Sequence, residues 1–205
     1  MPDAPTSTPL AAATPVAHAE RVITDSRVLA AMSHPLRRRL LDLLKLDGPG
    51  TASTLAQHTG EAVGNVSHHL KALHAAGLIE PAPELARDRR EHWWRRTGAT
   101  LCWSSADFAE DAAAEAVARA AESLNLERQT GYVRRFADRP QAEQERWPLG
   151  PFSTEAWMRV TDEELAEVHA EITAVLNRWA DRALPDDGRE RASVFAFARA
   201  VPAAP

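Results

Sequence analysis

The stretch LAQHTGEAVGNVSHHLKALHAAGLIE, residues 55–80, has the pattern of two short helices joined by a tight turn. Gly60 ends the first helix, and Gly77 follows the second in the way that a glycine follows many helix C-termini. Between the two glycines an apolar stripe recurs at helical spacing: Val63, Val66, Leu70 and Leu73. The stretch therefore predicts a helix, a turn and a second helix whose stripe faces a core.

The flanking sequence extends this pattern into a small domain. A short helix is expected at 25–32, and Pro35 suits the first turn of a longer one that stops at Gly48 and Pro49. Thr51 is expected to cap the helix that ends at Gly60. Extended segments are predicted at 78–82 and 91–96, with a charged loop between them. Helices followed by a β-hairpin therefore account for residues 21–100.

Three histidines, at positions 68, 69 and 74, lie on the second helix of the quoted stretch. On a helical wheel with Val66 at zero they point at about 200°, 300° and 80°. Two histidine ligands on one helix need a spacing of three or four residues. A metal site on this helix alone is therefore disfavoured. We expect His69 to flank the core and His74 to lie at the surface.

The face opposite the stripe has a composition that suits the DNA major groove. It carries small, amide, hydroxyl and cationic residues and has no acid between Asn65 and Ala76. Small residues allow close approach, amides and hydroxyls reach base edges, and lysine meets phosphate. The candidate contacts on or beside this face are Gly64, Asn65, Ser67, His68 and Lys71. Val63 belongs to the stripe, but it lies near the helix start and is a further candidate, for contact with a thymine methyl group.

In order along the chain, VLAAMSHPLRRRLLDLL, LAQHTG, VSHHLKAL and AGLI resemble the winged helix-turn-helix regulators of the ArsR-like family. The resemblance covers roughly residues 25–97. It implies that the helix at about 62–76 is a recognition helix and that the following hairpin is a wing. Ala62 stands where that family usually has a Ser or Thr cap, and the missing cap costs about 1 kcal/mol.

Arg87, Arg89 and Arg90 cluster at the expected tip of the wing. They fit either a solvated turn, partly neutralised by Asp88 and Glu91, or contact with phosphate and the minor groove. We favour the DNA contact. Residues 21–100 hold 12 Lys and Arg against 8 Asp and Glu, whereas residues 101–205 hold 12 against 19. The positive charge therefore gathers in the part that resembles a DNA-binding domain.

The fold class expected is mainly α with a small β component, in three segments. Residues 1–20, rich in Pro, Ala and Thr, are expected to be a disordered tail, followed by the winged helix-turn-helix domain at 21–100. Residues 101–205 are expected to form a dimerisation or effector region. This region would contain a long helix at 107–138, with a possible break at Gly131, followed by a strand, a helix and a strand at 154–160, 161–184 and 191–201.

A regulator of this kind can respond to a metal ion, to oxidation or to a small molecule, and each signal needs residues that detect it. The helix before the recognition helix has no cysteine, and His169 is the only histidine of the second half, so metal sensing is disfavoured. Cys102 has apolar neighbours and is expected to be a structural cysteine rather than a redox switch. Tryptophans at 103, 147, 157 and 179 fit either a core or a pocket for a small apolar or aromatic effector. No cofactor is expected.

These patterns predict a homodimeric regulator of transcription, most simply a repressor, that binds an inverted repeat in double-stranded DNA. A winged helix that binds protein, or a metal- or redox-responsive regulator, is the alternative. An enzyme is disfavoured because no nucleophile elbow and no paired catalytic carboxylates are present. Without a secretory signal or a long apolar run, the protein is expected in the cytoplasm, with no membrane contact.

Overall fold

The computed structural model describes residues 20–204 except 89, 99 and 149. The chain forms two compact units. The first, called here the large unit, comprises residues 20–155 and 191–197 of the described chain. The second, the small unit, comprises residues 156–190 and 198–204. The predicted tail at 1–20 lies outside the described residues except for Glu20, which begins a strand.

Residues that favour a helix start are found at the beginning of each of the first three helices. Asp25 caps one helix by accepting a hydrogen bond from the Arg27 amide (2.9 Å). Pro35 occupies the first turn of the next, where its missing N–H costs nothing. Thr51 and Thr54 form a reciprocal capping box on a third. The helices are α1 Ser26–Ser33, α2 Pro35–Leu46, α3 Ala52–Thr59 and α4 Val63–Ala75.

Two glycines set the ends of the helix-turn-helix. Gly60 follows α3 with φ of 75°, and Gly77 follows α4 with φ of 66°. Both angles lie in the left-handed region, which costs glycine little because it has no Cβ. The Gly77 amide donates to the His74 carbonyl (2.8 Å), and the Leu78 amide donates to the Leu73 carbonyl (3.0 Å). These bonds turn the chain out of α4 and into the hairpin, as the sequence predicted.

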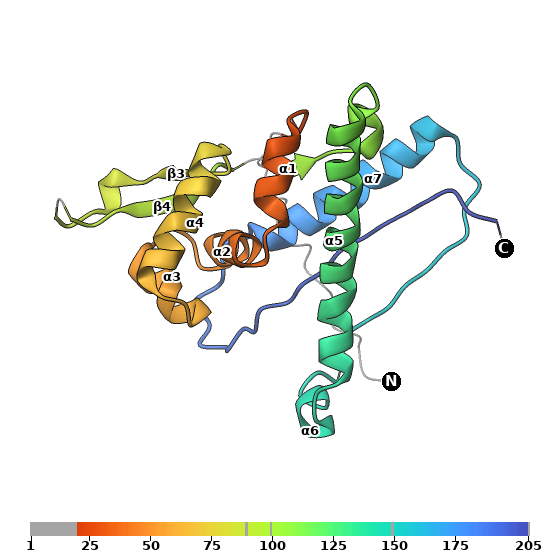
Figure 1. Ribbon diagram of the computed structural model, residues 1–205. Coiled ribbons are helices and arrows are strands. Elements are labelled where there is room, and N and C mark those ends of the chain that lie inside the picture. Colours follow the sequence, from red (N-terminus) through yellow and green to blue (C-terminus); the bar gives the residue numbers. More distant parts are fainter. Residues whose placement is uncertain (1–19, 89, 99, 149, 205) are drawn as a thin grey trace, which may run out of the picture. The chain divides into compact units, whose positions relative to one another are not determined.

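The wing is an antiparallel hairpin with a third strand beside it. β4 Trp93–Arg96 pairs with β3 Ile79–Pro81 on one side and with the short β2 Gly50–Thr51 on the other. A 3₁₀ turn, η1 Pro83–Leu85, follows β3. In Figure 1 the hairpin extends past α3 and α4, to the left of both helices. The two predicted strands are confirmed, and β2 adds a strand that the sequence pattern did not indicate.

A second, parallel pairing joins the two ends of this domain. β1 Glu20–Val22 runs beside β5 Thr100–Cys102. The Ile23 amide continues the ladder by donating to the Cys102 carbonyl (2.9 Å). The chain therefore leaves the domain beside the point where it enters.

The apolar stripes of the helices meet in one core. Leu29 of α1, Leu40 of α2, and Val66, Leu70 and Leu73 of α4 are each 0% exposed. Burying one such side chain stabilises a fold by about 1.5–3 kcal/mol relative to leaving it in water. The core thus fixes which face of α4 looks outward.

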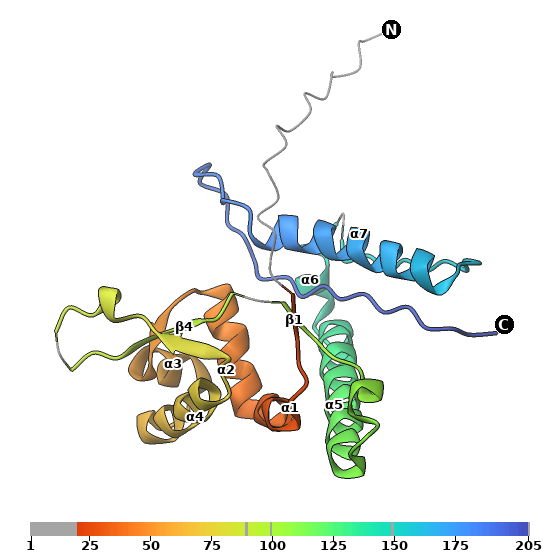
Figure 2. The same ribbon diagram turned by 90° about the horizontal axis from the view of Figure 1, so that it is seen from above.

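A long helix, α5 Ala112–Ala137, packs against α1 and against the 3₁₀ turn η2 Ser105–Phe108. Its contact face is made of small residues, and Ala118 and Ala121 are buried. The views in Figure 1 and Figure 2 both place α1 between α2 and α5. The helix continues through Gly131, so the break considered from the sequence does not occur. A single turn, α6 Gln141–Gln144, follows it.

The small unit contains one helix, α7 Asp162–Ala180, among its described residues. Thr161 and Glu164 form a capping box at the start of this helix. The strands predicted at 154–160 and 191–201 are wrong, since neither segment has regular secondary structure. A strand needs a partner for its backbone, and no described strand pairs with either segment. None of the described helices is both long and apolar enough to cross a membrane.

Candidate nucleic-acid interface

Packing of α4 against the core exposes the face that the sequence singled out. Because Val66, Leu70 and Leu73 point inward, residues about half a turn away point outward. Val63 is 47% exposed, although it begins the apolar stripe. The residues of this face, called here the α4 face, are exposed Val63, Gly64, Asn65, His68 and Lys71, with Ser67 half-buried.

The first turn of α4 lacks the side-chain cap that α1, α2 and α3 each have. Ala62 stands at the N-cap and makes no side-chain hydrogen bond, as predicted. Glu61 instead accepts a hydrogen bond from Nδ2 of Asn65 (2.8 Å). A Cβ added at Gly64 would meet nothing within 4 Å. The helix start is therefore open to solvent and held by one exposed side-chain pair.

The histidines of α4 point in different directions, as the wheel predicted. His68 is exposed, and its ring centroid lies 5.5 Å from that of His69. His69 is half-buried against His34, 4.4 Å between ring centroids, and its Nδ1 is buried without a hydrogen-bond partner. Burial, followed by the nearby His34 and Arg37, lowers the pKa of His69 below its ordinary value. Among the residues described, no three His, Cys, Asp or Glu side chains are placed to hold a metal ion.

His74 has a role that the sequence reasoning missed. Its Nδ1 lies 3.1 Å from the carbonyl oxygen of Ile79, and its ring packs on Trp94, 5.2 Å between centroids. It therefore ties the end of α4 to both strands of the wing, although its surface position was predicted correctly. A histidine in the last turn of a helix directly before a hairpin was the available signal.

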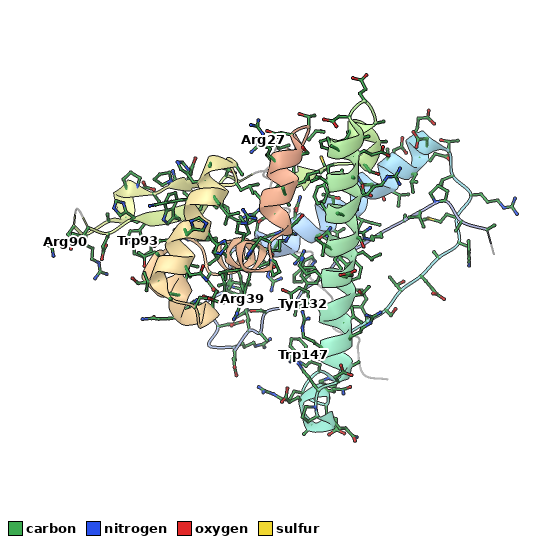
Figure 3. All side chains as sticks on the ribbon, viewed as in Figure 1. Arg27, Arg39, Arg90, Trp93, Tyr132 and Trp147 are labelled. Carbon is green, nitrogen blue, oxygen red and sulfur yellow. The ribbon has the colours of Figure 1, made fainter. Side chains whose placement is uncertain are left out.

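The tip of the wing presents cations whose acidic neighbours are engaged with the backbone. Arg87 and Arg90 are exposed, and Figure 3 shows Arg90 at the far end of the hairpin. Asp88 accepts from the Arg90 amide (2.7 Å), and Glu91 accepts from the Arg87 amide (3.0 Å). The third candidate, Arg89, lies outside the described residues. The acids therefore shape the turn, and the side chains of Arg87 and Arg90 extend into solvent.

The remaining arginines of the domain have structural partners. Arg95 pairs with Glu80 (2.7 Å) and with Glu84 across the hairpin. In the run at 37–39, Arg37 donates to the Ala30 carbonyl (3.3 Å). Arg39 donates to the carbonyls at the C-terminal end of α3, those of His58 (2.9 Å) and Thr59 (3.0 Å). Consecutive residues on a helix point in different directions, and here two of the three tie α2 to neighbouring helices.

Cys102 is half-buried on β5, and its Sγ lies 3.7 Å from the Arg21 carbonyl oxygen. The half-buried position of its side chain fits a cysteine that packs in the structure. His169 on α7 is exposed.

A family model and a relative of known function match this chain in sequence. A family model described as a helix-turn-helix domain matches residues 32–82. The transcriptional repressor SdpR of Bacillus subtilis is 43% identical over 54 residues, which cover 26% of this chain. The matched stretch spans 59% of the length of that repressor.

One of the solved structures that this chain resembles comes from Mycobacterium bovis. It is the homodimeric winged helix-turn-helix DNA-binding domain of a possible ArsR-family transcriptional regulator. Its sequence is 25% identical, and the alignment covers 51% of this chain and 83% of that one, with a TM-score of 0.33.

Proposed function

We propose that the protein is a DNA-binding repressor of transcription with an ArsR-like winged helix-turn-helix domain, and that it binds an inverted repeat as a homodimer. The helix-turn-helix match over residues 32–82 and the likeness to a transcriptional repressor support this proposal. The observation that carries the proposal is the α4 face. It is exposed, it contains no acid, and it begins with residues small enough to admit a DNA backbone. The recognition helix of this motif lies in the major groove, with its N-terminal residues at the base edges.

We assign separate tasks to the exposed side chains. Asn65, Ser67 and His68 read base edges, because amide, hydroxyl and imidazole groups donate and accept hydrogen bonds. Val63 contacts thymine methyl groups, and Lys71 contacts phosphate. For Asn65 to reach a base, its bond to Glu61 must break. Repulsion between the Glu61 carboxylate and the phosphates would favour that release.

The wing would lie on the backbone beside the major groove. The guanidinium groups of Arg87 and Arg90 are exposed on a hairpin that the His74 contact fixes to the end of α4. We assign both to phosphate or minor-groove contact and extend the assignment to Arg89 by its position in the sequence.

The homodimer is proposed from α7. Leu165, Val168, Ile172, Val175 and Trp179 form a stripe along this helix at helical spacing. Ile172, Val175 and Trp179 are at least 39% exposed, and the small unit has no other described helix or strand against which they can pack. Two copies of the helix would bury both stripes in a two-fold interface. Two recognition helices then suit half-sites about one helical turn apart.

The test is a selection of random duplex DNA on the full chain, followed by titration of the enriched sequence at several salt concentrations. We expect an inverted repeat and a steep salt dependence, since each neutralised phosphate releases counterions. Asn65→Ala should narrow the gap between operator and random DNA by about 1–3 kcal/mol. Lys71→Ala should weaken binding to both alike. An operator preference that survives Asn65→Ala would contradict the assignment of base reading, and no enrichment would favour a domain that binds protein.

A further inference from the structure

A cleft lies within the large unit, where α1 and α2 face α5. Its volume is about 410 Å³, within the range of small-molecule sites, which span about 300–1,000 Å³. One part of its wall is apolar, with Leu29 and Met32 from α1 and Leu124 from α5. Figure 3 shows Tyr132, a residue of the opposite part, on the α5 side that faces α2. Residues of the helix-turn-helix domain and of the long helix α5 therefore line the cleft together.

The polar part of the wall has more positive than negative charge. Of the described residues that line the cleft, four are arginines and one is an aspartate. Asp42 pairs with Nη1 of Arg128 at 3.0 Å and lies 3.8 Å from Nε of Arg38. The Arg38 and Arg128 side chains are only 24% and 19% exposed. Burial, together with the nearby Arg128 cation, lowers the pKa of Arg38. One carboxylate is therefore shared between two largely buried guanidinium groups.

Three buried N–H groups of the cleft residues have no hydrogen-bond acceptor among the residues that the structure describes. They belong to Nε of Arg38, Nε of Arg128 and Nε1 of Trp103. Buried donors are nearly always paired in native proteins, and these three would gain an acceptor if their side chains turned toward a ligand in the cleft. Two of them are on guanidinium groups, which hold carboxylates through paired N–H donors.

An aromatic ring already packs against the edge of this wall. Phe195, from the returning segment 191–197 of the large unit, stacks on Tyr132 with 4.6 Å between ring centroids. The Arg128 guanidinium lies 5.1 Å from the centroid of the same phenylalanine ring. Arg135 lies 4.5 Å from the centroid of the Tyr132 ring. Rings and guanidinium groups therefore alternate here, and such a surface attracts flat aromatic groups.

We propose that this cleft binds a small organic carboxylate with an aromatic body. The carboxylate would accept from Arg38 and Arg128, and the ring would lie between the apolar wall and Tyr132. The bound anion would supply the second negative charge that the two guanidinium groups lack. Because α2 belongs to the DNA-binding domain and α5 does not, occupancy would fix one relative to the other. This coupling rests on the proposed function, whereas the binding itself does not.

The test measures binding by calorimetry on the full chain without DNA. The probes are phenylacetate, its neutral amide phenylacetamide, and acetate, which has the charge without the ring. We expect phenylacetate to bind at least tenfold more tightly than either control. Arg128→Met keeps the apolar stem and removes the charge, so it should lower phenylacetate affinity at least tenfold. The matched control is Arg119→Met on the same helix, an exposed arginine that pairs with Glu115 outside the cleft.

A second variant tests the cleft independently, in case Arg128→Met does not fold. Leu124→Trp fills the cleft from a position that is 45% exposed, and it should abolish phenylacetate binding while the melting temperature is retained. Equal phenylacetate affinity in Arg128→Met and Arg119→Met would overturn the proposal, as would the absence of phenylacetate binding to the parent chain. An operator titration with and without phenylacetate then tests the coupling separately. Phenylacetate binding without an effect on DNA would leave the site intact and remove only its regulatory role.

Discussion

Gly64 stands in the first turn of α4, at a position where alanine would fit the free protein. A Cβ there meets nothing within 4 Å, and alanine favours a helix over glycine by up to about 1 kcal/mol. We therefore expect Gly64→Ala to raise the free energy of unfolding in urea and to weaken operator binding, because the methyl group would meet DNA.

The control for this prediction is Gly98→Ala, which also adds a methyl group in open space, in the loop after β4. Unchanged operator affinity in Gly64→Ala would show that the helix start does not approach DNA closely.

His69 gives the stability of the domain a pH dependence. Burial lowers the pKa of His69 in the folded state, with His34, Arg37 and His68 acting in the same direction and Glu61 in the opposite one. As the pH falls below 6.5, the ordinary pKa of histidine, the unfolded chain takes up a proton at this position more readily than the folded chain does. The free energy of unfolding should therefore fall as the pH is lowered. Replacing His69 by leucine should flatten this fall between pH 7 and pH 5 in urea titrations. Parallel pH profiles for parent and variant would rule out His69 as the source.

For single residues, the sequence predicted the direction in which a side chain points better than it predicted the residue that the side chain contacts. The 3.6-residue period alone indicated which residues of α4 face outward, since Val66 and Leu70 must face the core. The Glu61–Asn65 bond follows the i, i+4 spacing and was within reach of the sequence. The contact between His74 and Trp94 was not, because it depends on how the hairpin folds back beside α4.

The wing should contribute equally to the binding of any DNA, whatever the DNA sequence. Replacing Arg87 and Arg90 together by alanine should weaken operator and random DNA alike. The slope of log affinity against log salt should become shallower by up to about 1.8, because each lost phosphate contact removes about 0.9. Arg119→Ala on α5 is the matched control, since that arginine pairs with Glu115. A full salt slope in the double variant would mean that the two side chains remain in solvent.

Elements with their own start and stop signals were predicted, and elements that depend on a distant partner were not. Pro35, Thr51 and Gly60 mark helix ends through local geometry, and α2, α3 and α4 begin and end where expected. β2 is two residues long and forms only because Trp93 and Trp94 lie opposite it. The segment 154–160 has a strand-like composition, but no described strand lies beside it.

At the scale of the whole molecule, α7 is the element expected to hold two copies together. Ile172→Glu would place a charge in the middle of its apolar stripe, where burial without a partner is costly. We expect the dimer to dissociate in sedimentation equilibrium and operator affinity to fall with it. Glu171→Gln changes the adjacent exposed residue and should leave the dimer intact. A dimeric Ile172→Glu variant would place the interface elsewhere.

The α4 face could be predicted from the sequence, whereas the cleft proposed as a ligand site could not. The α4 face could be identified because one helix contains nearly all of it. The cleft beside Asp42 could not, since Arg38 and Arg128 are 90 residues apart and meet only when α5 packs on the domain. The tryptophans indicated a pocket or a core, and Trp103 alone among the four lines the cleft.

The parallel pairing of β1 with β5 sets the order in which the protein can be completed during its synthesis. Glu20 pairs with Thr100, so the first strand of the domain emerges 80 residues before its partner. At about 5–20 residues per second, the ribosome leaves β1 waiting for about 4–16 s. The helix-turn-helix can assemble in that interval, because α1 to α4 lie between the two strands. The helix α4 can therefore be in place before the long helix α5 has been made.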